Sequence, residues 1–313
     1  MTVAKVAEED FIRLWSEIGP HAISRDYGVS LAAIYTRRRF IEKKLGIVLQ
    51  VPRDQVVVAA NKAIVTLQVT DGQVLIGSDA HIWPGDRSTV QRAFIAFAKK
   101  LKPKAIIANG DFFDGSMISR WPSIGWESKP NVRQEIEAVK DYLADLALAS
   151  PSSFKLWPLG NHDQRFETKI ANAIPEYAGL KGVHLKDHFP EWTPCWRVDV
   201  NDDIVVRHRE YGGEHADWNN VVKGGKTIVT GHDHRIGGVP FKNYAGVKWG
   251  IRCGFMGDSP LDPQFINYLE GREPNWHPGF VVLTFRGGRM MQPEFVLRVD
   301  DETVEYRGDF VSV

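Results

Sequence analysis

The sequence has little of several features, and each scarcity excludes a class of protein. Cysteine occurs only at Cys195 and Cys253, with no CxxC pair, so neither a disulfide framework nor a cysteine zinc site is expected. No apolar run approaches the roughly 20 residues that span a bilayer. The first residues, MTVAKVAEEDF, lack the basic start and apolar centre of a signal peptide. We therefore expect a cytoplasmic protein with no membrane partner.

The chain also lacks an excess of charge of either sign. Lys plus Arg and Asp plus Glu number 39 each, so the net charge indicates no partner, and any nucleic-acid surface must come from local clustering. Of the 313 residues, 43% are hydrophobic and 25% charged, which is typical of a globular protein with one large core and room for a small second module. We expect a helical domain at 1–50, a linker at 51–62 and a main domain at 63–313. The oligomeric state stays open.

Residues 8 to 46 are predicted to be helical. Apolar residues recur at helical spacing from Phe11 to Ile18, and Gly19-Pro20 is expected to end that segment. A short helix should follow and stop at Gly28, and Ser30 can cap a longer one. The side of that longer helix expected to be buried comprises Leu31, Ile34, Tyr35, Phe40, Ile41 and Leu45. A short helix, a glycine turn and a longer helix resemble a helix-turn-helix.

The longer helix is locally basic. Between Arg25 and Lys44 there are six basic residues and two acidic ones. Phosphate contacts require such an excess of cations. The expected nucleic-acid contacts here are Arg37, Arg38, Arg39, Lys43 and Lys44. The alternative is a helical cap whose basic face is merely solvated; we favour nucleic acid as a partner, with DNA ahead of RNA.

The main domain alternates strands and helices and then changes pattern. Strand-like runs at 74–82, 104–114 and 154–163 are separated by helical segments at 86–101 and 131–148, and after Leu180 short β-rich runs follow one another. Alternation first and short strands later predict an α/β fold with two sheets packed on each other and helices outside.

Five polar clusters each follow an apolar strand-like run. They are Asp79-Ala80-His81, the run Gly110 to Asp114, the run Gly160 to Asp163, His208, and the run Gly231 to His234. Ligands gather outside the carboxyl ends of strands in layered sheets, so five strand ends could bring these side chains to one place. Each cluster alone has an ordinary explanation as a turn, a cap or a buried histidine, but the ordered set of five does not.

The residue types in these clusters indicate metal chemistry. Asp, His and Asn offer oxygen and nitrogen ligands without a thiolate, which suits manganese, iron or zinc better than copper or an iron–sulfur centre. The number of ligands suits two ions that share one carboxylate. Such sites place the ions about 3.5–4 Å apart and favour hydrolysis of phosphoryl esters.

At this point the sequence resembles the calcineurin-like metallophosphoesterases. The family signature runs DxH, GDxxD, GNHD or GNHE, a separate His, and GHxH. All five parts occur here in order over residues 79 to 234, and the resemblance covers roughly residues 63 to 300. It implies a four-layer αββα sandwich of two mixed β-sheets. The separate His is the weakest match, and His208 is preferred to His184, His188 or His215 because it ends a strand-like run.

The resemblance also implies a role for each residue. It assigns Asp79, His81, Asp111 and His234 to one ion, and Asp111, Asn161, His208 and His232 to the other. Asp111 would bridge the two ions, a hydroxide between them would attack phosphorus, and His162 would protonate the leaving oxygen. Asp114 and Asp163 would orient neighbouring groups from behind the ligands. The expected ions are Mn²⁺, with Fe, Zn and Mg as alternatives.

Two expectations concern the substrate. The segment 115–130 carries Trp121 and Trp126, which could stack nucleobases over the site or fold into a loop of their own; both readings stay open. The expected reaction is hydrolysis of phosphodiester bonds in nucleic acid. The alternatives are a phosphomonoesterase that acts on a nucleotide or phosphoprotein, and a DNA-binding regulator whose phosphoesterase domain is inactive.

Overall fold

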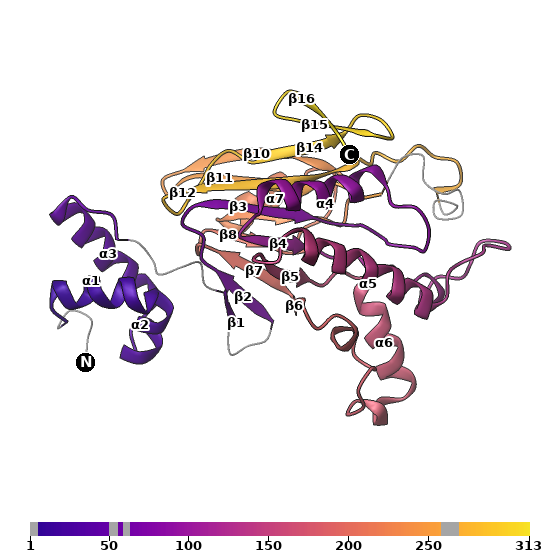
Figure 1. The fold of residues 1–313 in the computed structure, drawn as a ribbon, viewed down its shortest axis with the longest axis horizontal. Helices are drawn as coiled ribbons and strands as arrows, with labels where there is room; N and C mark the ends of the chain where they lie inside the picture. Colours follow the sequence, from indigo (N-terminus) through magenta and orange to yellow (C-terminus); the bar gives the residue numbers. More distant parts are fainter. Residues whose placement is uncertain (1–5, 50–55, 59–62, 258–268) are drawn as a thin grey trace.

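The computed structural model describes residues 6–49, 56–58, 63–257 and 269–313. At its N-terminal end, helices α1 (Glu8–Glu17), α2 (Gly19–Tyr27) and α3 (Leu31–Leu45) lie together at one end of the molecule (Figure 1). They enclose a small core of their own, made by Phe11, Trp15, Ile23, Ile34, Ile41 and Leu49. In the described part of the chain, no helix has the length and apolar character needed to cross a bilayer.

The ends of these helices follow the sequence. Gly28 ends α2 at φ 64°, and the Ser30 hydroxyl accepts a hydrogen bond from the Ala33 N–H at the start of α3, both as predicted. Helix α1 ends at Glu17, just before Gly19-Pro20, also as predicted. The same pair starts α2, because a proline in the first turn lacks only an N–H that the helix does not use.

The expected buried side of α3 is partly wrong. Ile34 and Ile41 are buried, whereas Phe40 is 63% exposed and Leu45 is 45% exposed. Ile34 and Ile41 are seven residues apart and therefore share one face, from which Phe40 is turned away. Leu45 lies on the side of Ile41 but is the last residue of the helix. The helix contacts α1 and α2 through a narrow stripe, which leaves Phe40 in solvent, whereas Leu45 is exposed at the end of the helix.

The rest of the chain forms two mixed β-sheets. In the first, the strands lie in the order β1 (Val56–Val58), β2 (Ile64–Leu67), β7 (Arg197–Val200), β8 (Ile204–Val206), β9 (Thr227–Thr230), β11 (Gly246–Cys253) and β10 (Ile236–Asn243). In the second, the order is β16 (Asp309–Ser312), β15 (Thr303–Tyr306), β14 (Glu294–Arg298), β12 (Gly279–Arg286), β3 (Gly72–Gly77), β4 (Ala105–Ala108), β5 (Phe154–Pro158) and β6 (Thr193–Cys195), with β13 (Arg289–Met290) paired to β12.

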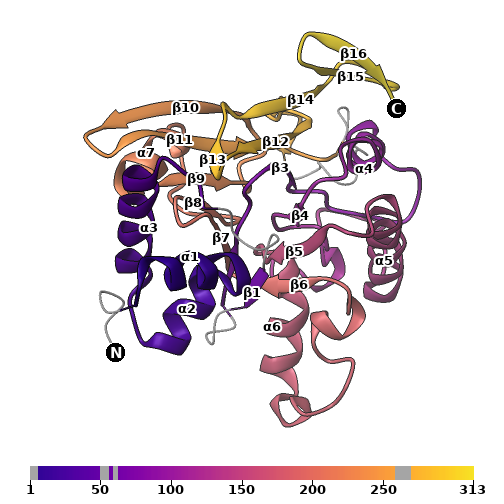
Figure 2. The same ribbon diagram turned by 60° about the vertical axis from the view of Figure 1, so that its left-hand side comes forward.

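The sheets and helices form the four layers that were predicted. Between the sheets lies a core that includes Val65, Ile76, Ile107, Val198 and Val281. Helices α4 (Thr89–Leu101) and α5 (Val132–Ala149) cover the outer face of the second sheet, and α7 (Ala216–Gly224) packs on the first sheet (Figure 2). The αββα sandwich is therefore confirmed.

Part of the range expected to be a linker belongs to the first sheet. Within residues 51–62, β1 pairs antiparallel with β2, with Val57 opposite Thr66. The remainder of that range, 51–55 and 59–62, lies outside the described residues. Three consecutive valines are a strong strand signal, because β-branched side chains suit a pleated sheet.

The topology brings the motif segments to a common edge. Strands β3, β4 and β5 are parallel neighbours in one sheet, and β8 and β9 are parallel neighbours in the other. Because parallel strands end on the same side, the loops after β3, β4 and β5 lie at one end of their sheet and those after β8 and β9 at one end of theirs. A hydrogen bond from the His232 N–H to Asp79 joins the two sets of loops at the same end of the sandwich. After the third loop the chain enters α6 (Asp163–Ala173), and the short helices η2 (Ser116–Ile118), η3 (Pro175–Tyr177) and η4 (Leu185–His188) lie in the connections.

Candidate metal centre

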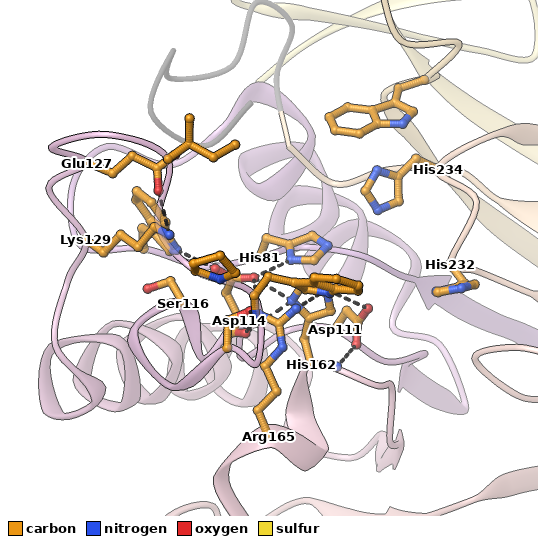
Figure 3. Close-up of a pocket in the computed structure, with 16 residues that line it drawn as sticks. His81, Asp111, Asp114, Ser116, Glu127, Lys129, His162, Arg165, His232 and His234 are labelled. Carbon is orange, nitrogen blue, oxygen red and sulfur yellow. Dashed lines mark hydrogen bonds and ion pairs between the residues drawn. The ribbon is translucent and has the colours of Figure 1, made fainter. Parts of the chain in front are cut away.

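The five motif loops bring their side chains together. Ligand atoms lie within 4.8 Å of one another in three groups: Asp79, His81 and His234; Asp111, His208 and His232; and His81, Asp111 and His162. Each of the first two groups contains three of the four residues that the family resemblance assigns to one ion, and the third group adds His162. Figure 3 shows five of these residues directed toward one pocket: His81, Asp111, His162, His232 and His234. His232 and His234 lie on the opposite side from Asp114 and Arg165.

Asp79 is buried and divides its two oxygens between the backbone and the cluster. Its Oδ2 accepts hydrogen bonds from the Ser78 hydroxyl at 2.6 Å and the His232 N–H at 2.8 Å. Its Oδ1 lies 3.3 Å from His234 Nε2 and 3.9 Å from His208 Nε2. One oxygen thus fixes the carboxylate, and the other faces the imidazoles where a cation would lie.

Asp111 has the same arrangement between the two groups. Its Oδ1 accepts the His162 N–H at 2.8 Å. Its Oδ2 lies 3.1 Å from His208 Nε2 and 3.9 Å from His162 Nε2. Asp111 belongs to two of the three ligand groups, as a carboxylate shared by two ions must.

Two of the imidazoles are oriented through Nδ1. His208 Nδ1 lies 2.8 Å from the Asn109 carbonyl oxygen, and His81 Nδ1 lies 3.0 Å from Asp114 Oδ1. A histidine held in this way directs Nε2 toward the metal. His184 and His188 instead contact the carbonyls of Ala178 and Gly182.

Asn161 provides the clearest test of whether the site fits a metal. Its Oδ1 is buried and has no hydrogen-bond partner among the residues that the structure describes. A buried carbonyl oxygen left unpaired costs about 1–3 kcal/mol, and a cation would satisfy it. Carboxylate, imidazole and amide ligands without sulfur suit Mn, Fe or Zn. The residues present therefore fit a divalent metal centre.

The charges of the cluster are mutually dependent. Burial raises the pKa of Asp79, but the neighbouring His208 and His234 outweigh burial and lower it to about 2. Burial lowers the pKa of His208, but the carboxylates of Asp111 and Asp79 outweigh burial and raise it to about 10. The buried carboxylates thus attract positive charge strongly, which bound divalent ions would supply in place of a proton.

The backbone at the candidate ligands is strained. Positive φ angles occur at Asp79 (54°), His81 (41°), Asp111 (55°), His232 (74°) and His234 (59°). Such conformations cost about 1–3 kcal/mol each in residues other than glycine, and they cluster at functional sites. The sharp turns after the strands direct successive side chains into one small volume.

Glycines allow the ligand loops to approach one another. A Cβ atom at Gly110 would lie 2.3 Å from His208 Nδ1, and one at Gly160 would lie 2.1 Å from Asp111 Oδ1. A Cβ at Gly231 would lie 1.8 Å from Ser78 Oγ. In the sequence, Gly160 was readable only as part of a turn; the structure shows that it must be small because a proposed ligand occupies the adjacent space.

We expect Gly110→Ala to weaken binding of one ion by at least about tenfold, because the new methyl group displaces the His208 ring. Isothermal titration with Mn²⁺ measures this. Gly212→Ala is the control, because a Cβ there meets nothing within 4 Å. If Gly110→Ala binds two ions as tightly as the control, His208 is not a ligand.

Asp114 is hydrogen-bonded to two histidines of the candidate site. Its Oδ1 lies 3.0 Å from His81 Nδ1 and 2.6 Å from His162 Nδ1, and its Oδ2 accepts the Trp83 indole N–H at 3.0 Å. Burial raises the pKa of Asp114, but the bonds to His162 and His81 outweigh burial and keep it well below its usual value. One carboxylate therefore orients both a candidate ligand and the candidate acid.

Asp163 connects two of the loops. Its carboxylate accepts the backbone N–H groups of Asp111, Phe113 and Gly160 at 2.8, 3.0 and 2.8 Å. It also accepts the Trp157 indole N–H at 3.1 Å. Burial and the charge of Asp111 raise its pKa to about 6. Asp163 thus fixes the second and third motifs relative to each other.

His162 and Arg165 lie together at the pocket wall. An Arg165 N–H donates to His162 Nε2 at 3.0 Å, and another donates to the Asp114 carbonyl at 2.9 Å. Arg165 was not expected from the sequence. It lies one helical turn after His162 because α6 begins at Asp163, the last residue of the third motif. That spacing was the signal that could have identified it.

A pocket of about 630 Å³ is lined both by the cluster and by the segment 115–130; Figure 3 labels Ser116, Glu127 and Lys129 of that segment. Trp121 and Trp276 line it. Trp126, which was also expected to contact nucleic acid, does not line it and is fully exposed.

Glu135 on α5 fixes the start of the segment 115–130. Its carboxylate accepts the N–H groups of Gly115 and Ser116 at 2.6 and 3.0 Å and the Ser116 hydroxyl. Burial, and then the charge of Asp114, raise the pKa of Glu135 to about 7. The first two residues of the segment are therefore held by a buried carboxyl whose pKa is raised toward neutral pH.

This shift predicts a pH dependence of stability. The folded pKa lies above the ordinary value of 4.5, so the fold favours the protonated form and loses stability as pH rises from about 4.5 to about 7. We expect the metal-free protein to lose up to about 3 kcal/mol relative to Glu135→Gln between pH 5 and pH 8. Urea unfolding at both pH values measures this difference. Parallel profiles for the two proteins would contradict it.

The basic residues of α3 divide into two sets. Arg37 donates to the Val6 carbonyl, Arg38 pairs with Glu42 at 2.8 Å, and Lys44 pairs with Glu8 at 2.9 Å. Arg39 and Lys43 are exposed. Contacts within the helical domain thus involve three of the five residues, and nucleic-acid binding by this surface stays a prediction.

The chain belongs to the calcineurin-like phosphoesterase family, whose model matches residues 72–250, more than half of its length. It is accordingly a metallophosphoesterase, a hydrolase of phosphoric esters, and its family implies divalent metal ions.

Relatives were found among phage proteins and solved structures. The chain is 27% identical to the Gene 54 protein of Mycobacterium phage D29 and 25% identical to that of phage L5, each over 72% of this chain and 92% of the relative. Vps29 of Entamoeba histolytica, solved with Zn²⁺, is 13% identical over 77% of this chain and 98% of that one, with a TM-score of 0.40. YfcE, a phosphoesterase from E. coli, is 12% identical over 71% and 97%, with a TM-score of 0.30.

Proposed function

We propose that this protein hydrolyses phosphodiester bonds of nucleic acid at a centre of two divalent ions. The observation that carries the proposal is the position of Asp111, which belongs to two ligand groups and lies beside His162. A cytoplasmic location is part of the same proposal.

The proposed ligands follow the two sets expected from the sequence. One ion would be held by Asp79, His81, Asp111 and His234, and the other by Asp111, Asn161, His208 and His232. When bound, the ions supply an activated nucleophile and neutralise charge on the phosphoryl group. Asp79 and Asp111 each keep one oxygen fixed by backbone N–H groups, so neither carboxylate needs to reorganise when charge develops.

His162 would protonate the leaving oxygen through Nε2. Asp114 fixes the ring through Nδ1, and Nε2 faces the pocket beside Asp111. In the resting state Arg165 donates to that same nitrogen. A negatively charged phosphoryl group would attract the guanidinium away from Nε2, which would leave this nitrogen able to carry and donate a proton.

Mn²⁺ is the proposed ion, with Fe, Zn and Mg as alternatives, because a ligand set of oxygen and imidazole suits Mn²⁺. Protein stripped with a chelator should not hydrolyse bis-p-nitrophenyl phosphate, and added Mn²⁺ should restore turnover. Restoration by none of the four metals would contradict a metal-dependent diesterase.

We propose that the helical domain binds the nucleic-acid substrate through α3. Arg39 and Lys43 are exposed cations on α3. Neither forms an ion pair with another residue that the structure describes, so both can contact phosphate. We expect Arg39→Glu with Lys43→Glu to weaken cleavage of DNA by at least about tenfold at low salt, without affecting bis-p-nitrophenyl phosphate. The matched control is Lys99→Glu with Lys100→Glu, two exposed cations on α4. Equal effects of the two pairs would contradict recruitment by α3.

The pocket favours a second candidate, a phosphomonoesterase that acts on a nucleotide. The segment 115–130 bounds the pocket. The pocket volume of about 630 Å³ is sufficient for a free nucleotide, so the site does not require a polymeric substrate. Comparison of kcat/KM for p-nitrophenyl phosphate and bis-p-nitrophenyl phosphate separates the two candidates. A phosphoprotein substrate has no comparable support, and the intact donor set opposes an inactive regulator.

A further inference from the structure

We propose that the part of the pocket between Trp121 and Trp276 binds one unpaired nucleobase of the substrate. This inference rests on the proposed function, because it identifies what the phosphoester at the metal centre is attached to. The same pocket is lined by His81, Asp111 and His162 at one end and by both tryptophans further out. A group bonded to a phosphate at the cluster can therefore reach the tryptophans.

Trp276 lines the pocket and packs against the loop that carries His234. Its ring lies edge-on to His234 with ring centres 4.4 Å apart, and it contacts Phe255 at 5.1 Å. The N–H of His277, the next residue, donates to the His234 carbonyl at 2.8 Å. The position of this indole is thus set by the same turn that positions a proposed metal ligand.

Trp121 lies in the segment 115–130 and is not part of a core of that segment. Its side chain lines the pocket yet is 67% exposed. The Arg120 guanidinium lies 4.9 Å from the ring centre, which orients the indole. A loop folded on its own tryptophans would bury them, so the exposure of Trp121 favours the alternative, an aromatic surface available to a ligand.

A polar pair lies in the same wall. Lys129 Nζ is 2.6 Å from Glu127, and their side chains are only 15% and 5% exposed. Both residues line the pocket. An ammonium and a carboxylate side by side offer one donor and one acceptor, the pattern needed at the edge of a nucleobase.

The size of the pocket limits how the base is presented. About 630 Å³ is within the range for small-molecule sites, which suits one nucleotide at a time. A base inside a duplex has both faces covered by its neighbours and must leave the stack before it can lie on an aromatic side chain. The ligand is therefore a nucleoside phosphoester at a strand end or in a single strand.

The test compares two chromogenic diesters with the same leaving group. We expect Trp121→Ala to raise KM for the p-nitrophenyl ester of thymidine 5′-monophosphate by about tenfold and to leave methyl p-nitrophenyl phosphate within about twofold. Trp126→Ala is the matched control, because this tryptophan lies in the same segment, is fully exposed and is outside the pocket. It should change neither substrate.

Other outcomes overturn the proposal. Equal losses on both diesters would mean that Trp121 shapes the site without contacting a base, and no loss on either would remove it from substrate binding. If a phenyl ester is favoured as much as the thymidine ester, the pocket selects any aromatic ring and not a nucleobase.

A binding measurement separates this inference from the proposed function. Thymidine 5′-monophosphate should quench the tryptophan fluorescence of the wild-type protein with Mn²⁺, and the Kd should rise about tenfold in Trp121→Ala only. Quenching without turnover of any diester would support the base site while contradicting the proposed reaction. Absence of quenching, whatever the turnover, overturns the base site.

Discussion

Asp111→Asn is expected to lower kcat/KM for bis-p-nitrophenyl phosphate by at least about 1,000-fold, or about 4 kcal/mol of transition-state stabilisation. The substitution keeps the shape of the side chain but removes the charge that both ligand groups share. The oxygen of the new side-chain amide can still accept the hydrogen bond from the His162 N–H. Its nitrogen would then face His208, at a position where a negatively charged oxygen is needed.

The control for this prediction is Asp141→Asn, an exposed carboxylate on α5 far in sequence from every motif. It should retain wild-type kcat/KM. Circular dichroism of both variants checks that the fold is intact. If Asp111→Asn keeps activity within about tenfold of the control, a shared carboxylate is not the basis of catalysis.

His162→Ala is expected to have the second-largest effect, and its size should depend on the leaving group. General acids contribute about 100- to 10,000-fold when the leaving oxygen needs a proton. An alkyl ester should therefore lose activity in that range, whereas a p-nitrophenyl ester, whose phenolate leaves unprotonated, should lose far less. A series of esters with leaving groups of increasing pKa gives the slope directly.

The matched control here is His188→Ala, because its Nε2 contacts the Gly182 carbonyl away from the pocket. A loss of the same size for alkyl and p-nitrophenyl esters would contradict the role of His162 as the acid. Such a result would instead favour a role in binding the phosphoryl group.

The convergence of the proposed ligands could be predicted because each of them follows a strand. Asp79, Asp111 and Asn161 come after parallel neighbours in one sheet, so the topology places them at one edge once the sandwich is assumed. The family resemblance implied that Asp114 and Asp163 lie behind them. Their partners could not be predicted, because these partners are backbone N–H groups and indoles that only the folded loops bring near.

Other parts of the site depend on packing that the sequence does not state. Arg165 reaches the pocket from α6, and Glu135 on α5 holds the start of the segment that bounds the pocket. Neither residue belongs to a motif. The exposure of Phe40 depends on which stripe of α3 faces its neighbours, and several apolar positions on that helix were compatible with burial. The pairing of β1 required knowledge of where β2 lies, which local patterns do not contain.

The most direct test of the whole account is anomalous X-ray scattering from crystals of the protein grown with Mn²⁺. The account predicts two peaks about 3.5–4 Å apart, with Asp111 between them and Asn161 beside one of them. A single peak, or manganese bound away from Asp79, Asp111 and His232, would contradict it.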